Sequence, residues 1–132
     1  MIHLLKKTFI LFLFSLNFVS CSTATTITKK LYTDGRFRYR DSETELSEGN
    51  AVESGTFLTN VNGEYTLTFI LNRMEYIIEG TYFIAAKDDK NGEVTLVSEN
   101  SEILETLESV TYKNYYFMYF IFSDIGKICF AR

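Results

Sequence analysis

The chain contains no proline and no tryptophan, and its single histidine, His3, lies close to the N-terminus. Histidine is the commonest general base and the commonest metal ligand in proteins. The sequence also lacks a phosphate-binding P-loop, a GxSxG turn, an HExxH motif and a CxxC motif. We therefore expect a protein that is not an enzyme, with no catalytic residues, no cofactor and no metal site.

The first twenty residues have the three-part layout of a secretory signal peptide. Lys6 and Lys7 form a basic segment, and an almost unbroken apolar run follows over residues 8–19. A membrane-spanning helix needs about 20 apolar residues, whereas this run is shorter and is interrupted by Ser15 and Asn17. Residues 1–20 are therefore predicted to be a signal peptide that is removed on export.

The sequence "FVSC" (18–21) at the end of this leader resembles the lipobox of bacterial lipoproteins, with Phe18 in place of the usual leucine. The resemblance implies lipid attachment at Cys21: a thioether to diacylglycerol, cleavage before the cysteine, and acylation by fatty acids such as palmitate. It also implies an exported protein, lipid-anchored to the cell membrane or the outer membrane, and Ser22 favours the outer membrane. The alternative is ordinary cleavage after Ala24, within the small-residue sequence "STA".

Only two cysteines occur in the chain, Cys21 and Cys129. A sulfur that carries lipid cannot form a disulfide, so the fold must be stabilised by its core alone. Cys129 lies between Ile128 and Phe130, which is typical of a small packed residue rather than a reactive thiol.

Charge and length limit the partners and the number of domains. Removal of residues 1–20 takes away Lys6 and Lys7, so the 13 basic residues fall to 11 against 17 acidic ones. An acidic chain without a basic patch argues against nucleic acid and against electrostatic binding to anionic lipids. The remainder is long enough for one domain, predicted over residues 31–132 after a flexible tether at 21–30.

The domain is predicted to be mainly β. Asn-Gly or Asp-Gly pairs and one "DIG" sequence mark turns at 34–35, 62–63, 91–92 and 124–126. Between them apolar residues alternate with period two, which indicates antiparallel strands with one buried face: "RFRYR", "YTLTFIL", "EYIIEGTYFIAA", "EVTLV" and "KICFAR". Gly80 falls on the buried face of its strand, where a missing side chain lets a sheet bend sharply.

Two segments differ from this pattern. The acidic stretch 41–50 is expected to be a loop. In 98–110, Ile103, Leu104 and Leu107 recur at helical spacing, which predicts one short helix near 100–109. The acidic residues of this segment are interpreted as a solvated helix face: Glu99, Glu102, Glu105 and Glu108.

"YYFMYFIF" (115–122) is apolar on both faces if it forms a strand. Either one face joins the core and the other lies under the predicted helix, or the second face is an exposed aromatic patch for a partner, a ligand or a membrane. Inward-facing tyrosines raise the further possibility of an amphipathic pocket inside the domain: Tyr39, Tyr65, Tyr76 and Tyr82.

The segments "GTF", "NGEYTLTF", "EGTY" and "NGEVTLV" (within 55–98) resemble the small lipocalin-like domains of bacterial lipoproteins. The resemblance implies an antiparallel up-and-down meander of seven or eight strands, forming a small barrel or a strongly coiled sheet. It carries over no functional residue except Cys21.

Three functions follow as hypotheses. The first is a membrane-anchored, non-catalytic lipoprotein that binds a small apolar ligand or a protein partner. The others are a periplasmic inhibitor or chaperone-like partner of an envelope enzyme, and a purely structural surface lipoprotein.

Overall fold

The computed structural model describes residues 35–99 and 101–132. The predicted signal peptide, the lipidation site at Cys21 and the tether at 21–30 lie outside the described residues. None of the helices within the described part is long and apolar enough to cross a membrane.

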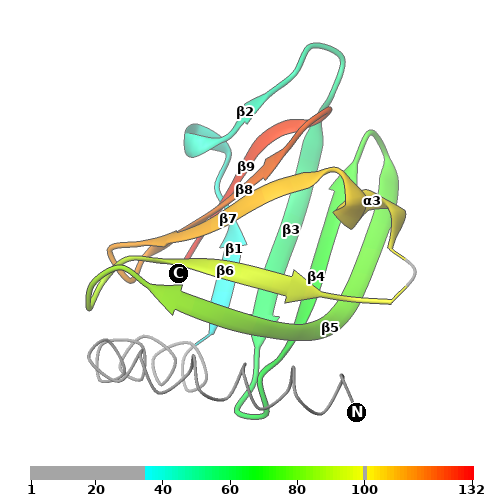
Figure 1. Ribbon diagram of the computed structural model, residues 1–132. Coiled ribbons are helices and arrows are strands. Elements are labelled where there is room, and N and C mark those ends of the chain that lie inside the picture. The colour runs from blue at the N-terminus through cyan, green and yellow to red at the C-terminus, as the bar shows by residue number, and fades with distance from the viewer. Residues whose placement is uncertain (1–34, 100) are drawn as a thin grey trace, which may run out of the picture.

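Eight of the strands in the described residues form a closed antiparallel barrel (Figure 1). Each pairs with the next in chain order, and β1 closes the barrel by pairing with β9 through Arg38–Ala131 and Tyr39–Phe130. A two-residue strand, β2 (Glu45–Leu46), pairs with the start of β9, on the edge that does not pair with β8. The prediction of a seven- or eight-stranded meander is confirmed. The barrel strands are β1 (Arg36–Tyr39), β3 (Val52–Thr59), β4 (Glu64–Leu71), β5 (Met74–Ala86), β6 (Gly92–Val97), β7 (Leu107–Lys113), β8 (Phe117–Phe122) and β9 (Gly126–Ala131).

Three of the predicted turns join neighbouring strands. Gly63 (φ 79°) and Gly126 (φ 109°) have the left-handed backbone that glycine adopts without steric cost, in the β3–β4 and β8–β9 turns. The "NG" at 91–92 ends the β5–β6 connection. For the pair at 34–35, Asp34 lies outside the described residues. Two further hairpins turn at Asn72–Arg73 and Asn114–Tyr115, where all four residues have positive φ without any glycine.

Gly80 lies where β5 changes partner. Residues before it pair only with β4, and Thr81 onward pairs with β6. Figure 1 shows β5 curving strongly around the barrel. The absence of a side chain at Gly80 permits the bend, as predicted.

The structure corrects three details of the prediction. The helix, α3, covers only Glu102–Glu105, and β7 begins at Leu107, because Val110 and Tyr112 are buried as strand residues. The segment 41–50 is not only loop: it contains a 3-10 turn, η2 (Asp41–Glu43), and β2. The strand expected over 115–122 starts at Phe117, since Tyr115 belongs to the preceding turn.

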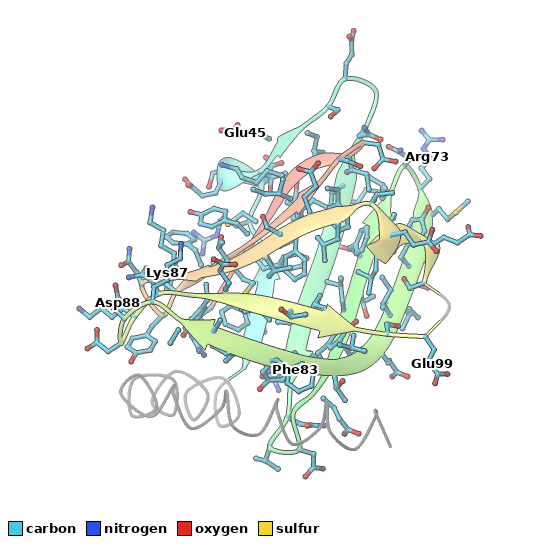
Figure 2. All side chains as sticks on the ribbon, in the orientation of Figure 1. Glu45, Arg73, Phe83, Lys87, Asp88 and Glu99 are labelled. Carbon is cyan, nitrogen blue, oxygen red and sulfur yellow. The ribbon has the colours of Figure 1, made fainter. Side chains whose placement is uncertain are left out.

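Aromatic side chains fill the interior of the barrel. The ring of Phe120 on β8 lies 5.2 Å from that of Phe57 on β3 and 5.1 Å from that of Phe130 on β9, between centroids. The ring centroid of Phe37 lies 6.1 Å from that of Phe57 and 6.0 Å from that of Tyr112. Figure 2 shows side chains extending from all sides into the barrel. Rings from strands far apart in sequence therefore meet across the interior.

Candidate functional site

The tyrosines predicted to line an internal pocket do not form one. Tyr65 and Tyr82 are buried within the packed core, whereas Tyr39 and Tyr76 are half-buried at its margin. Burial raises the pKa of Tyr65, and the nearby Ser98 hydroxyl partly offsets this effect. The Tyr39 hydroxyl donates to Oδ1 of Asp41 at 3.0 Å. The four side chains therefore serve different local contacts.

A seam in the barrel wall lies between β6 and β7. The two strands are joined through only two residue pairs, Gly92–Tyr112 and Glu93–Thr111, and then diverge (Figure 1). A cavity of about 230 Å³ lies between their remaining parts, beside Leu104 of α3. Its apolar lining is supplied by Val94, Leu96, Leu104, Leu107 and Val110.

A larger groove, of about 450 Å³, lies where β1 meets β9. Strand alternation places Arg36, Arg38 and Arg40 on one side of the β1 segment, opposite the buried Phe37. All three arginines line the groove, together with Tyr39, Ala131 and Arg132. Within the described residues no carboxylate pairs with Arg36 or Arg38, so the groove concentrates positive charge.

An aromatic ladder continues from this groove across the outer face of β8. The ring of Tyr116 meets that of Phe117 edge-on at 4.7 Å, and Phe117 stacks on Tyr119 at 5.8 Å. Cations cap both ends: the Arg40 guanidinium lies 5.6 Å from the Tyr116 centroid, and Lys127 Nζ lies 5.2 Å from that of Tyr119. We call Arg36, Arg38, Arg40, Tyr116, Phe117 and Tyr119 together the arginine–aromatic face.

Backbone contacts hold this face in place. The Arg40 amide donates to the Cys129 carbonyl at 2.8 Å. The Thr44 hydroxyl donates to the Arg40 carbonyl and accepts from the Cys129 amide, both at 2.9 Å. In addition, Nη2 of Arg40 donates to the Tyr116 hydroxyl at 2.9 Å. The segment after β1 is thus fastened to β9, which orients Arg40 toward the ladder.

Both predictions for 115–122 are partly met. One face of β8 is in the core, through Met118, Phe120 and Phe122. The other face is neither fully covered nor fully open: Phe117 and Tyr119 are half-buried, and Lys127 lies over the ring of Tyr119. The helix does not cover them, because Ile103 and Leu104 of α3 pack against the core cluster.

The sequence argument missed the basic patch. The alternation in "RFRYR" places three arginines on one face, but the net acidic charge led to the expectation that no such patch existed. The contact between Arg40 and Tyr116, which are 76 residues apart, became visible only with the barrel closed.

Cys129 is fully buried, in line with the prediction of a packed residue. Burial, and then the negative charge of Glu43, raise the pKa of the thiol from its ordinary value of 9.0 to about 11. A thiol with this pKa is almost entirely protonated at neutral pH and is a poor nucleophile.

Carboxylates are dispersed over the described part of the chain. No group of three or more His, Cys, Asp or Glu in this part is arranged to hold a metal ion. Asp88 instead closes the β5–β6 turn, where its Oδ1 accepts from the amides of Lys90 and Asn91 at 2.8 Å each. These hydrogen bonds lower the pKa of Asp88.

The fold defines a small closed barrel of eight antiparallel strands with one added edge strand. No protein-family model, curated protein or solved structure matches the chain.

Proposed function

We propose that the chain is a bacterial envelope lipoprotein that is held at the membrane by acyl chains on Cys21. Its lipocalin-like barrel has no catalytic role and binds a protein partner through the arginine–aromatic face. The observation that carries this proposal is the concentration of Arg36, Arg38 and Arg40 beside a partly exposed aromatic ladder, on a chain whose formal net charge is −4.

The chemistry of this face favours an acidic protein surface as the partner. Arginine presents a planar fork of N–H donors that matches a carboxylate in two-point hydrogen bonding. Arginine and tyrosine are also over-represented among the residues that dominate binding energy at protein interfaces. Arg38 is exposed and has no carboxylate partner in the described residues, so binding would not first require an internal ion pair to break.

A small apolar ligand is the second candidate, and the seam between β6 and β7 favours it. The seam is lined by leucine and valine side chains. Its cavity of about 230 Å³ is smaller than the roughly 300 Å³ at which ligand pockets usually begin. Native mass spectrometry of the purified protein tests this candidate: a co-purified lipid of constant mass supports it, and its repeated absence counts against it.

Crosslinking in cells tests the partner. A photo-reactive phenylalanine derivative replaces Tyr116 in the full chain, and crosslinked products are identified by mass spectrometry. We expect one predominant product with an acidic envelope protein. The single change Arg38→Glu should remove it, because carboxylates would then face carboxylates.

Arg73→Glu is the matched control, since Arg73 is an exposed arginine in the β4–β5 turn and its reversal changes net charge equally. A product that survives Arg38→Glu, or that both changes abolish, contradicts the proposal. A product with an enzyme would specify an inhibitor or chaperone-like role. The absence of any product would favour a purely structural role.

The lipid anchor is tested separately by the intact mass of the protein extracted from membranes. We expect the mass of residues 21–132 plus a diacylglyceryl group and fatty acyl chains, and loss of this added mass in Cys21→Ala. An unmodified N-terminus at Thr25 would show ordinary secretion instead.

A further inference from the structure

The chain enters the barrel beside the β3–β4 turn. The carbonyl of Gly35, the first described residue, accepts a hydrogen bond from the Thr59 amide at 2.8 Å, and Arg36 lies opposite Leu58 in the sheet. Figure 1 shows the start of β1 and the β3–β4 hairpin at the same end of the barrel. Any anchor located N-terminal to Gly35 is therefore connected to the barrel at this end, which we call the tether end.

The tip of the β3–β4 turn presents an apolar side chain to solvent. Val61 is 69% exposed. The turn around it is fixed by the Asn60 side chain, whose Oδ1 accepts from the amides of Asn62 and Glu64 at 2.9 and 3.1 Å. Nδ2 of Asn60 donates to Oε1 of Glu64 at 2.9 Å. The turn thus holds Val61 outward without needing an apolar residue there for its own stability.

A second apolar group lies next to this tip. The Tyr82 amide donates to the Gly63 carbonyl at 3.0 Å, so Phe83 follows directly after a residue attached to the turn. Phe83 is 63% exposed and lies on β5 on the lower side of the barrel (Figure 2). Val97, 48% exposed, is its diagonal neighbour on β6, because Phe83 pairs with Thr95 and Thr81 with Val97.

We propose that the tether end docks on the bilayer, with Val61 and Phe83 inserted among the lipid headgroups. The proposal rests on the lipid anchor at Cys21. Apolar side chains and an aromatic ring at a protein surface are typical of groups that bind the membrane interface. Residues of both charge signs lie toward this end, Arg36 on β1 and Glu64 at the start of β4, which suits a zwitterionic lipid surface rather than a strongly anionic one.

The length of the connecting chain makes such contact frequent. Gly35 lies fourteen residue steps after Cys21, a span of at most about 50 Å when extended and about 20 Å on average for a flexible chain. Tethering makes the second contact intramolecular, so that even a weak apolar interaction is populated. The tether end is therefore the part of the barrel that the anchor holds nearest to the lipid on average.

The test uses the acylated full chain with Val61→Cys, labelled with the environment-sensitive dye NBD and reconstituted into phosphatidylcholine vesicles. Cys129 is buried and Cys21 carries lipid, so the dye reports position 61 alone. We expect a blue-shifted emission, and several-fold stronger quenching by spin-labelled lipids than for the control. The matched control is Glu48→Cys, in the exposed β2–β3 loop at the opposite end of β3 (Figure 1).

The outcomes separate the docking from the anchor. A protein that floats with the vesicles, but whose dye at 61 is quenched no more than at 48, overturns docking and leaves the anchor intact. A protein that does not float overturns both. A blue shift at 61 that disappears when protein is diluted over more lipid, without quenching by lipid, would identify a second copy as the occupant and would also overturn docking.

Discussion

The α-carbon of Gly80 lies so close to the carbonyl of Val97 that a Cβ added at Gly80 would be 1.9 Å from that oxygen. The ring of Tyr65 closes the same space from inside the barrel, at 3.1 Å from the added Cβ. The position therefore admits no side chain while β5 bends between β4 and β6.

Gly80→Ala is expected to lower the free energy of unfolding by about 3 kcal/mol, because backbone atoms must move to admit the methyl group. Glu79→Ala, at an exposed position of the same strand, is the control and should change it by less than about 0.5 kcal/mol. Urea denaturation followed by circular dichroism measures both. Equal effects of the two changes would mean that β5 adjusts freely at Gly80.

Phe120→Ala tests the packed interior. The Phe120 ring is fully buried between Phe57 and Phe130, and truncating such a ring costs about 3–5 kcal/mol. Phe83→Ala removes an exposed ring and should cost less than about 0.5 kcal/mol. The midpoint of chemical unfolding reports the difference, and similar midpoints would contradict a filled barrel.

The Cys129 thiol makes the free energy of unfolding depend on pH in the alkaline range. Because its pKa is raised from 9.0 to about 11 in the folded protein, the unfolded chain loses the proton first. The stabilisation of the folded protein by the protonated thiol is therefore complete below pH 9 and is lost as the pH rises toward 11. Two pKa units correspond to about 2–3 kcal/mol.

Buried tyrosines with raised pKa values, such as Tyr65, add an effect of the same sign above pH 10. Cys129→Ala isolates the thiol: its unfolding free energy should fall less than that of the wild type between pH 9 and 11. Parallel curves for the two proteins would show that the thiol does not contribute.

Arg73→Gly should stabilise the protein. Arg73 has φ 69° in an exposed two-residue turn. This left-handed conformation costs an L-residue about 1–2 kcal/mol of conformational free energy. Glycine's greater freedom in the unfolded chain offsets part of this gain. A rise in melting temperature of about 3 °C is expected. Arg73→Ala keeps the strained backbone and should give no rise; a rise of the same size would attribute the effect to the arginine side chain.

Local patterns predicted most of the β-architecture. Period-two alternation identified the buried face of β4, and the glycines at 63 and 126 marked two of the hairpins. The turns at Asn72–Arg73 and Asn114–Tyr115 were missed, because no glycine signals them and only strand pairing on both sides makes these conformations favourable. The helix was predicted too long because Leu107 and Val110 continue the helical spacing of Ile103 and Leu104. Both belong instead to β7, whose register shifts between Leu107 and Ser109.

The sequence by itself determined the strand period, the position of the bend at Gly80 and the scarcity of catalytic groups, because each depends on residues that are close together in the chain. Only the tertiary structure decided which side of β1 and β8 forms a common surface. The pairing of β1 with β9 joins the first and last strands of the barrel and brings Arg40 to Tyr116. No local pattern encodes such contacts, since they arise only when the meander closes and buries its aromatic face.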